Sequence, residues 1–277
     1  MTGTLYIVAT PIGNLADMTF RAIDTLKQVD VIAAEDTRHT RKLLTHFDIS
    51  TRLISCYREK EFERSQEIIS LLKEGQHVAL VSDAGTPAIS DPGAILVGEA
   101  RKQQIEIIPI PGPSAVTTAM SCAGIEESGF LFLGFAPPKD AQRKRFLKSY
   151  VSFPLPLVFY ESPHRIKKFI ASALETFGDR RVFWARELTK KYEELEDTSL
   201  KSLADGIDQE KIRGELVVII HPGSVAEPEG ENLEEILTWY YERQEYSMKD
   251  ACRKIAQDLG LSRSDVYQQA LIIWKKK

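Results

Sequence analysis

The sequence predicts an α/β protein that consists of two α/β domains and a helical extension at the C-terminal end. Over the first 120 residues, short apolar runs of strand type alternate with stretches of helical type. This alternation is typical of a mostly parallel sheet that is covered by helices on both faces. A second series of strands and helices begins near residue 124, and the last 45 residues show only helical patterns. We therefore expect domains over residues 1–123 and 124–222, followed by an extension over residues 232–277.

The strands of the first domain are expected at apolar runs that end in loops of small or polar residues. They are Leu5–Ala9, Val31–Ala34, Leu53–Ser55, Val78–Val81 and Ile105–Ile108. The helices between them are expected at Phe20–Leu26, Thr40–Phe47, Phe62–Lys73 and Ile95–Lys102, with a further helix after Ser114. The third of these helices is expected to end at Gly75, because glycine is favoured just past a helix terminus.

The second domain repeats this alternation, and the extension departs from it. Strands are expected at Phe130–Phe135, Leu157–Tyr160, Val182–Ala185 and Leu216–Ile220, and helices at Gln142–Tyr150 and Arg165–Phe177. His221–Glu231, with two prolines and two glycines, is typical of a linker. Three helices follow, at Leu233–Arg243, Lys249–Leu259 and Arg263–Trp274. Their outline resembles a helix-turn-helix, but most short three-helix units are packing devices, so nucleic-acid binding by this unit is the less favoured interpretation.

Composition excludes several classes of protein. The chain is 43% hydrophobic and 27% charged, and its longest apolar runs, such as Leu216–Ile220, are too short to span a bilayer. Residues 1–17 lack the basic start and apolar core of a signal peptide. Cys56, Cys122 and Cys252 form no C-x-x-C pair, and the five histidines form no H-E-x-x-H motif. We expect a cytoplasmic protein with reduced thiols, no membrane association and no metal.

Charge is distributed unevenly along the chain. The net charge of −4 disfavours nucleic-acid binding for the chain as a whole. Lys139–Lys148, however, carries five bases and one acid, and His164–Lys168 is a second basic stretch. Each cluster alone is most simply a solvated helix face. Two such clusters beside one cleft would favour a polyanion, and the candidate RNA contacts are Arg143, Lys144, Arg145, His164, Arg165 and Lys168.

The most informative stretch is Val78–Gly93, which reads V-A-L-V-S-D-A-G-T-P-A-I-S-D-P-G. A strand ends at Ser82-Asp83, and a loop of small residues, prolines and acids follows. In an open α/β sheet, ligands bind at such carboxyl ends of strands. Gly85 allows a ligand to approach the backbone closely, and the two prolines stiffen the loop. A simple turn needs fewer such residues, so the pattern favours a binding loop.

Two further loops support a ligand site. Thr10–Asn14 follows the first strand with a single glycine, which disfavours both a G-x-G-x-x-G dinucleotide site and a phosphate-binding G-x-x-x-x-G-K-[ST] loop. Pro109–Ala115 contains three prolines within five residues, and its Ser114 can cap the helix that follows while backbone N–H groups remain available to a ligand.

Six motifs in order resemble the tetrapyrrole-methylase-fold family. They are L-Y-I-V-A-T-P-I-G-N-L-A-D, A-A-E-D-T-R-H-T, V-S-D-A-G-T-P-A-I-S-D-P-G, P-G-P-S-A, F-Y-E-S-P-H-R and A-R-E-L-T-K. The match as a whole runs from about Leu5 to Ile220. Within the family they are similar to a branch that methylates the 2′-hydroxyl of a cytidine ribose in 16S ribosomal RNA, near the decoding centre. Relatives that modify tetrapyrroles usually show a G-D-P type loop where this chain has Ser82–Gly85, and this departure points away from porphyrin substrates.

The resemblance implies that S-adenosylmethionine binds in the cleft between the two α/β domains, usually in a homodimer, and that the partner is 16S rRNA in the small ribosomal subunit. Matched by position, the cofactor-binding residues are Pro11, Ser82, Asp83, Ala84, Gly85, Thr86, Ile89, Ser114, Ala115, Tyr160, Glu161, Ala185, Glu215 and Leu216. Alternatives remain open. They are a methyltransferase of the same fold acting on a tetrapyrrole or a protein side chain, and a non-catalytic RNA-binding assembly factor.

Methylation of a ribose hydroxyl requires alignment with the methyl group and is helped by a base or by a cation near the developing alkoxide. Polar residues follow two strands, at Glu35–Arg38 and at Arg186–Lys190. We expect Asp36, Arg38 and Lys190 to surround the reacting hydroxyl, because the carboxyl ends of these strands should face one crevice. Asp36 would equally suit the N-cap of the next helix.

Overall fold

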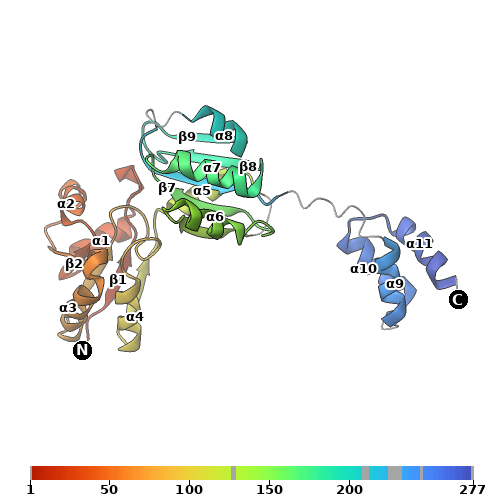
Figure 1. Ribbon diagram of the computed structural model, residues 1–277. Coiled ribbons are helices and arrows are strands. Elements are labelled where there is room, and N and C mark those ends of the chain that lie inside the picture. The colour runs from red at the N-terminus through yellow and green to blue at the C-terminus, as the bar shows by residue number, and fades with distance from the viewer. Residues whose placement is uncertain (1, 126–128, 208–211, 224–232, 244–245, 276–277) are drawn as a thin grey trace. The chain divides into compact units, whose positions relative to one another are not determined.

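The computed structural model of the protein describes residues 2–125, 129–207, 212–223, 233–243 and 246–275 (Figure 1). The chain divides into two compact units, Met1–Pro222 and Gly223–Lys277. The first unit contains two five-stranded sheets with their covering helices, and the second contains helices only. The predicted α/β class with C-terminal helices is therefore confirmed. Most of the predicted linker His221–Glu231 lies outside the described residues.

The first sheet is entirely parallel. Its strands are β1 (Leu5–Val8), β2 (Val31–Ala34), β3 (Arg52–Ser55), β4 (Val78–Val81) and β5 (Ile107–Ile110). They follow the order β3-β2-β4-β1-β5, and every residue of β2 and β4 is buried. Because the strands are parallel, the loops that follow them emerge at the same edge of the sheet. This arrangement brings the loops after β1, β2, β4 and β5 together.

Helices cover both faces of this sheet, as the alternating pattern predicts. One face carries α1 (Phe20–Gln28) and α2 (Thr37–His46), and the other carries α3 (Glu61–Lys73) and α4 (Ala94–Lys102). Two 3₁₀ turns, η1 (Leu15–Asp17) and η2 (Arg58–Lys60), lie in the connecting loops. Helix α1 begins where the hydroxyl of Thr19 accepts a hydrogen bond from the Ala22 N–H.

Strand β5 departs from the prediction, which placed it at residues 105–108 and Pro109 in a loop. Pro109 instead lies within the strand and pairs in register with Ile7. Proline has no N–H to donate to a neighbouring strand, so within sheets it is found mainly in edge strands. It is accommodated here because β5 is the edge strand of this sheet, next to β1.

The second sheet is mixed. Its strands are β6 (Leu131–Phe135), β7 (Leu157–Glu161), β8 (Arg181–Arg186), β9 (Glu194–Ser199) and β10 (Leu216–Ile220), in the order β6-β7-β10-β8-β9. Only β6 and β7 run parallel. Strand β9 was not predicted, since its sequence E-L-E-D-T-S lacks an apolar run. It is an edge strand, and its side chains are exposed or half-buried.

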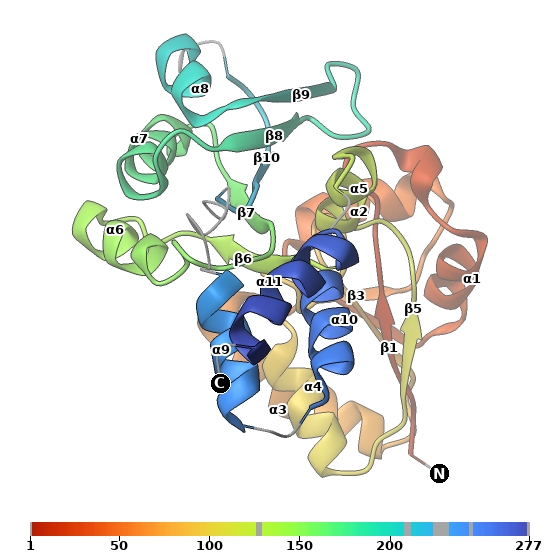
Figure 2. The ribbon, with the colours of Figure 1, turned by 90° about the vertical axis from the view of Figure 1, so that its right-hand side faces the viewer.

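Helices α6 (Asp140–Lys148), α7 (Ile166–Phe177) and α8 (Leu200–Gly206) pack on one face of the second sheet, and α8 is a further element that the sequence did not predict. The opposite face is covered by α5 (Ala115–Cys122), which is labelled in Figure 2. Val116 and Ala119 of this helix are buried in one apolar cluster with residues of the second sheet. Helix α5 follows the first sheet in the chain but packs on the second. The predicted domain boundary after residue 123 remains a prediction.

The second unit is a three-helix bundle, as predicted. It consists of α9 (Leu233–Arg243), α10 (Met248–Asp258) and α11 (Arg263–Lys275). Leu237, Cys252, Ile255, Val266 and Ala270 form its buried core. Among the residues that the structure describes, no helix is both long enough and apolar enough to cross a membrane.

One buried carboxylate fixes the start of α4, directly after the S-D-P-G end of the predicted binding loop. Oε1 of Glu61, at the beginning of α3, accepts hydrogen bonds from the N–H groups of Gly93 at 2.8 Å and Ile95 at 2.9 Å. The first N–H groups of a helix have no partner within the helix. Glu61 supplies two of these partners and thereby ties α3 to α4.

We predict that Glu61→Ala lowers the free energy of unfolding by about 1–3 kcal/mol, because two N–H groups lose a charged acceptor. Urea unfolding measures the change. Glu63→Ala, which removes an exposed carboxylate from the same helical turn, is the matched control. Equal stability of the two variants would contradict this role of Glu61.

Candidate active site

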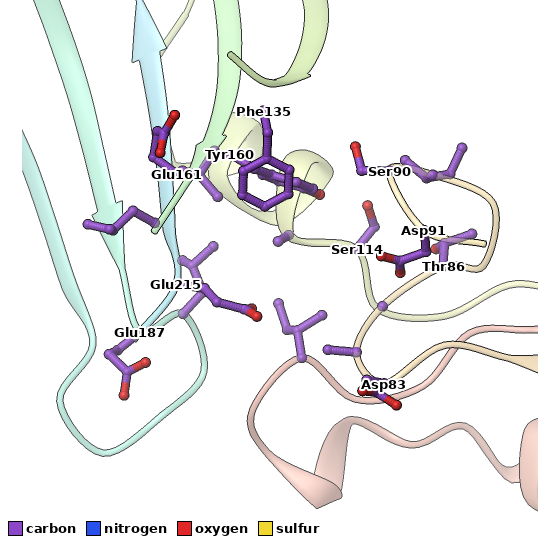
Figure 3. Close-up of a pocket in the computed structure, with 18 of the residues that line it drawn as sticks. Asp83, Thr86, Ser90, Asp91, Ser114, Phe135, Tyr160, Glu161, Glu187 and Glu215 are labelled. Carbon is purple, nitrogen blue, oxygen red and sulfur yellow. The ribbon is translucent and has the colours of Figure 1, made fainter. Parts of the chain in front are cut away.

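A cavity opens where the carboxyl-end loops of the first sheet meet the second sheet (Figure 3). The first sheet and its loops contribute Ile12, Glu35, residues 83–86 and 89–91, Ser114 and Ala115. The second sheet contributes Phe135, Tyr160, Glu161, Glu187, Leu188, Lys190 and residues 215–217. Figure 3 shows Asp91 and Ser114 on one side of the cavity and Glu215 and Glu187 on the other. The predicted binding loops therefore lie at one cavity.

The loops after β1 and β4 are joined by a pair of backbone hydrogen bonds. The N–H of Thr10 donates to the carbonyl of Gly85 at 2.9 Å, and the N–H of Gly85 donates to the carbonyl of Thr10 at 3.0 Å. The hydroxyl of Thr10 also donates to the carbonyl of Ser82 at 3.0 Å. Gly85 has a φ of +83°, and Ala88 and Ser90 of the same loop also have positive φ. Such conformations cluster at ligand sites, where the surrounding structure holds them.

The N-terminus of α5 forms a third part of the wall. Its Val116 N–H donates to Oη of Tyr160 in β7 at 3.1 Å, which ties the helix start to the second sheet. Thr86 Oγ1 donates to the carbonyl of Pro113 at 3.2 Å, so the loop after β4 is joined to the same segment. Ser114 occupies the N-cap position, but its hydroxyl makes no capping hydrogen bond.

The cavity is acidic. Its described lining carries one lysine, Lys190, and the carboxyl groups of Glu35, Asp83, Asp91, Glu161, Glu187 and Glu215. Burial, followed by the nearby charges of Asp91 and Asp83, raises the pKa of Glu35 to about 7. Burial is also the main cause that raises the pKa of Asp91 and of Glu161. An unbalanced group of carboxylates favours a cationic ligand and disfavours a phosphate inside the cavity.

Most of the predicted cofactor residues line this cavity. They are Asp83, Ala84, Gly85, Thr86, Ile89, Ser114, Ala115, Tyr160, Glu161, Glu215 and Leu216. Pro11 and Ser82 line an adjoining cavity, which shares Ile12, Asp83, Ala84, Lys190 and Glu215 with the first. Ala185 lines neither, because it is fully buried in the apolar cluster between α5 and the second sheet.

The predicted polar group of Asp36, Arg38 and Lys190 is brought together only in part. Asp36 is the N-cap of α2 and accepts a hydrogen bond from the Arg38 N–H at 2.8 Å. Its carboxylate also pairs with the Arg38 guanidinium at 2.8 Å, and these hydrogen bonds lower the pKa of Asp36. Neither side chain lines the two cavities described here, and that of Arg38 is 90% exposed. Lys190 lines both cavities, with Nζ 2.8 Å from Oε1 of Glu187.

Glu35 is the cavity residue that the predicted catalytic group omitted. The sequence holds a signal for it. Asp36 precedes the helical segment T-R-H-T and suits an N-cap, so its carboxylate is committed to the helix. The carboxylate one residue earlier follows the strand directly and remains available at the carboxyl edge of the sheet.

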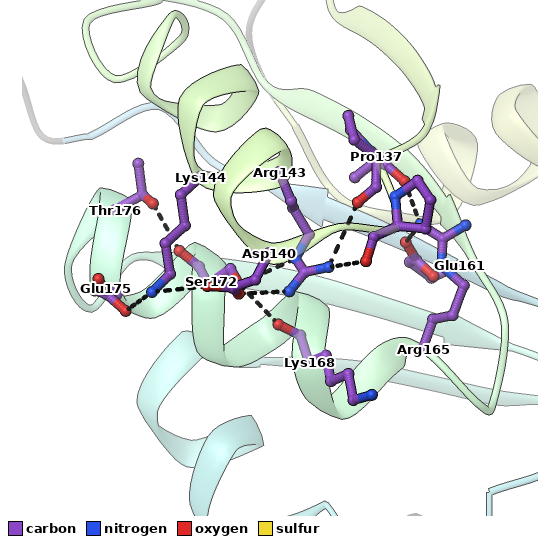
Figure 4. Close-up of polar contacts among 12 residues, drawn as sticks. Pro137, Asp140, Arg143, Lys144, Glu161, Arg165, Lys168, Ser172, Glu175 and Thr176 are labelled. Atoms are coloured by element: carbon purple, nitrogen blue, oxygen red, sulfur yellow. Dashed lines mark hydrogen bonds and ion pairs between the residues drawn. The ribbon is translucent and has the colours of Figure 1, made fainter.

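Arg143 does not lie where a phosphate contact would require. It is buried, and its guanidinium donates to Ser172 Oγ at 3.0 Å, to the Pro138 carbonyl at 3.0 Å and to Asp140 Oδ1 at 2.8 Å (Figure 4). These bonds join α6 to α7 and to the loop before α6. The prediction that Arg143 contacts RNA is therefore wrong, because its guanidinium is buried and bonded to groups inside the protein.

The other predicted RNA contacts differ in their ion pairs and in the exposure of their side chains. Lys144 pairs with Asp140 at 3.2 Å and with Glu175 at 2.6 Å, and Arg165 pairs with Glu161 at 3.0 Å. The Arg165 guanidinium also donates to the carbonyl of Ala136, so it helps to hold the cavity wall. The side chains of Arg145, His164 and Lys168 are exposed.

Residues 4–204 match the family of tetrapyrrole (corrin/porphyrin) methylases. The chain belongs to this family. Members of the family are S-adenosylmethionine-dependent methyltransferases.

Close relatives cover nearly the whole chain. A protein of Halalkalibacterium halodurans named ribosomal RNA small subunit methyltransferase I is 44% identical over 270 residues, which is 96% of this chain and 93% of the relative. A protein of the same name from Neisseria meningitidis serogroup B is 40% identical over 282 residues, with 99% and 95% covered. The similarity therefore extends into the C-terminal helices.

Solved structures confirm the fold. A cobalt precorrin-4 methyltransferase matches with a TM-score of 0.59 and 20% identity, covering 79% of this chain and 94% of that one. A diphthine synthase matches with a TM-score of 0.63 and 15% identity, covering 79% and 90%. At these identities the likeness concerns architecture, because unlike functions share such folds.

The residues of the cavity fit S-adenosylmethionine. The cofactor carries a positively charged sulfonium and an ammonium group, and carboxylates on both sides of the cavity can oppose these charges. Ile12, Phe135 and Leu188 offer apolar surface for the adenosine part. Gly85 leaves its backbone open at the cavity wall, since it has no side chain.

We predict that Gly85→Val weakens S-adenosylmethionine binding by about tenfold or more. An added Cβ would lie 3.4 Å from Ile12 Cγ2 and 3.8 Å from the Pro113 carbonyl oxygen. In addition, the φ of +83° strains any L-residue by about 1–3 kcal/mol, so valine favours a shifted loop backbone that no longer matches the cofactor. A loss of 1.4 kcal/mol in binding free energy corresponds to a factor of ten in affinity.

Calorimetric titration measures the affinity. Gly98→Val, in α4, is the matched control because an added Cβ there meets no atom within 4 Å. If folded Gly85→Val bound the cofactor as tightly as this control, the loop would not belong to the binding site.

Proposed function

We propose that the protein transfers the methyl group of S-adenosylmethionine to the 2′-hydroxyl of a cytidine ribose in 16S ribosomal RNA, near the decoding centre of the small subunit. The observation that carries the proposal is the 40–44% identity, over nearly the full chain, to proteins named ribosomal RNA small subunit methyltransferase I. The choice of the ribose and of the cytidine is supported by the resemblance of the chain's motifs to those of the 2′-O-methylating branch of the family.

The cofactor supplies an electrophilic methyl group, and the task of the protein is alignment and exclusion of water. In our proposal, the joined loops after β1 and β4 and the start of α5 hold the cofactor. Asp83 and Glu215 face its positive charges from opposite sheets. Lys190 lies where the two cavities meet, so its ammonium group can stabilise the negative charge that develops on the ribose oxygen.

The RNA is proposed to lie along α6 and α7, which pack against each other. These helices present the exposed bases Arg145, Lys148, Lys167 and Lys168. Phosphates would be held by these bases outside the cavity, because the acidic lining disfavours phosphate within it. This division matches a substrate whose sugar enters the site while its backbone remains at the surface.

Labelled S-adenosylmethionine and small ribosomal subunits from cells that lack the protein provide the direct test. A 2′-O-methyl group removes the hydroxyl that attacks the adjacent phosphodiester in alkali. We therefore expect the label in an alkali-resistant linkage that follows a cytidine. Label in alkali-sensitive RNA or in protein would contradict ribose methylation, and RNA binding without transfer would indicate an assembly factor.

We predict that Arg145→Glu combined with Lys168→Glu weakens RNA binding and leaves S-adenosylmethionine binding unchanged. Each phosphate contact contributes about 0.7–0.9 to the slope of log affinity against log salt, so the slope should flatten by roughly one to two. Filter binding at several salt concentrations measures it. Lys27→Glu combined with Lys73→Glu, on exposed positions of α1 and α3, is the control. Equal slopes for the two double variants would exclude this surface.

A further inference from the structure

We infer that Glu35 accepts the proton of the ribose hydroxyl during methyl transfer. This inference rests on the proposed function, because it assigns one step of that reaction to one side chain. It replaces Asp36 as the acidic member of the catalytic group. Lys190 keeps its role as the cation near the developing charge.

The sheet places Glu35 at the wall of the cavity. Strand β2 is the neighbour of β4, and Ala34 pairs in register with Val81. The residues that follow these two strands therefore leave the sheet side by side. The N–H of Asp36 donates to Asp83 Oδ1 at 3.1 Å, which joins the two loops at this level. Glu35 is thereby held with its half-buried side chain lining the cavity.

Several other carboxylates are engaged by cations. Asp36 is paired with Arg38, Glu161 with Arg165 at 3.0 Å, and Glu187 with Lys190 at 2.8 Å. A nearby cation stabilises the charged form of a carboxylate and makes it a weaker base. If one of these carboxylates accepted the substrate proton, it would become neutral and would lose its ion pair. The pKa of Glu161 is raised because burial outweighs its pairing with Arg165, but proton uptake would still break that ion pair. For this reason the three paired groups are poorer proton acceptors than Glu35.

The surroundings of Glu35 favour proton uptake. Burial has the largest effect on its pKa, followed by the carboxylates of Asp91 and Asp83, and together they raise it to about 7. The Asp83 N–H and the Arg58 guanidinium act in the opposite direction. The buried Cys56 thiol also interacts with Glu35. The pKa of Cys56 is raised to about 11, so this thiol is neutral near pH 7. A general base is most effective when its pKa lies near the working pH.

Every bond, electron pair and proton of the methyl transfer can be accounted for with the ribose, the cofactor and Glu35. The ribose oxygen forms a bond to the methyl carbon, the bond between that carbon and sulfur breaks, and its electron pair stays on sulfur. The hydroxyl proton passes to the Glu35 carboxylate. The carboxyl group then returns the proton to water when the product leaves.

The test uses single-turnover methyl transfer to small subunits at saturating S-adenosylmethionine, between pH 6 and pH 8.5. Below pH 7 Glu35 is largely protonated and unable to accept a proton, so the parent rate should rise with pH and level off above about pH 7. General-base assistance is typically worth about 10²–10⁴-fold. We expect Glu35→Gln to lose about that factor at pH 8 and to lose this rise with pH. Its affinity for the cofactor should stay within about threefold.

Two further variants separate catalysis from structure. Glu35→Asp should retain a pH-dependent rate above that of Glu35→Gln. Asp91→Asn removes a neighbouring negative charge, so it should lower the pKa of Glu35 and move the rise to lower pH. A merely structural role would not move the profile. Glu74→Gln, an exposed carboxylate at the end of α3, is the control for the substitution itself.

A Glu35→Gln rate within tenfold of the parent would overturn the inference, as would a loss of cofactor affinity that accounts for the slower rate. In both cases the parent would still form alkali-resistant linkages, and the proposed function would stand. Failure of the parent itself to methylate ribose would instead overturn the proposed function and this inference with it.

Discussion

The site depends on the packing of α5 and the loop after β1 against the second sheet. Val116 and Ala119 of α5, together with Ile12, share one buried cluster with Val158 and Val217 of the second sheet. Apolar burial of this kind is the main favourable term in folding. It holds the carboxyl-end loops of the first sheet against β7 and β10. The cavity is the space that remains between them, so neither sheet alone could form it.

The distribution of charge gives the cavity and the surface different partners. Carboxylates dominate the described lining of the cavity, whereas exposed bases lie on α6 and α7. Coulombic attraction then favours a cationic methyl donor inside and a polyanion outside. The net charge of −4 conceals this separation, because it sums two regions of opposite sign. A protein that handles RNA can therefore be acidic as a whole.

The sequence pattern predicted the buried strands correctly, because a buried strand requires a run of apolar residues. The strands at residues 31–34, 78–81 and 216–220 are buried apolar runs, and the sequence located each within the chain. An edge strand needs neither a continuous apolar run nor an N–H at every residue. The sequence pattern therefore missed β9 and did not place Pro109 in β5. A homodimer, the cytoplasmic location and the absence of a metal stay predictions.

Side-chain roles were harder to predict, because they depend on partners far along the chain. Arg143 belongs to a basic stretch typical of a solvated helix, yet its guanidinium is bound by Ser172, which lies 29 residues later. Only the packing of α6 on α7 reveals this. Asp36 and Glu35 are adjacent carboxylates, and the capping hydrogen bond of Asp36 decides which of them lines the cavity.

A crystal structure with S-adenosylmethionine bound tests most directly whether the cavity between the two sheets holds the methyl donor. The account predicts a cofactor that contacts residues 83–86 on one side and Tyr160 or Glu215 on the other, with its positive groups near carboxylates. A cofactor bound elsewhere, or held by one sheet only, would contradict it.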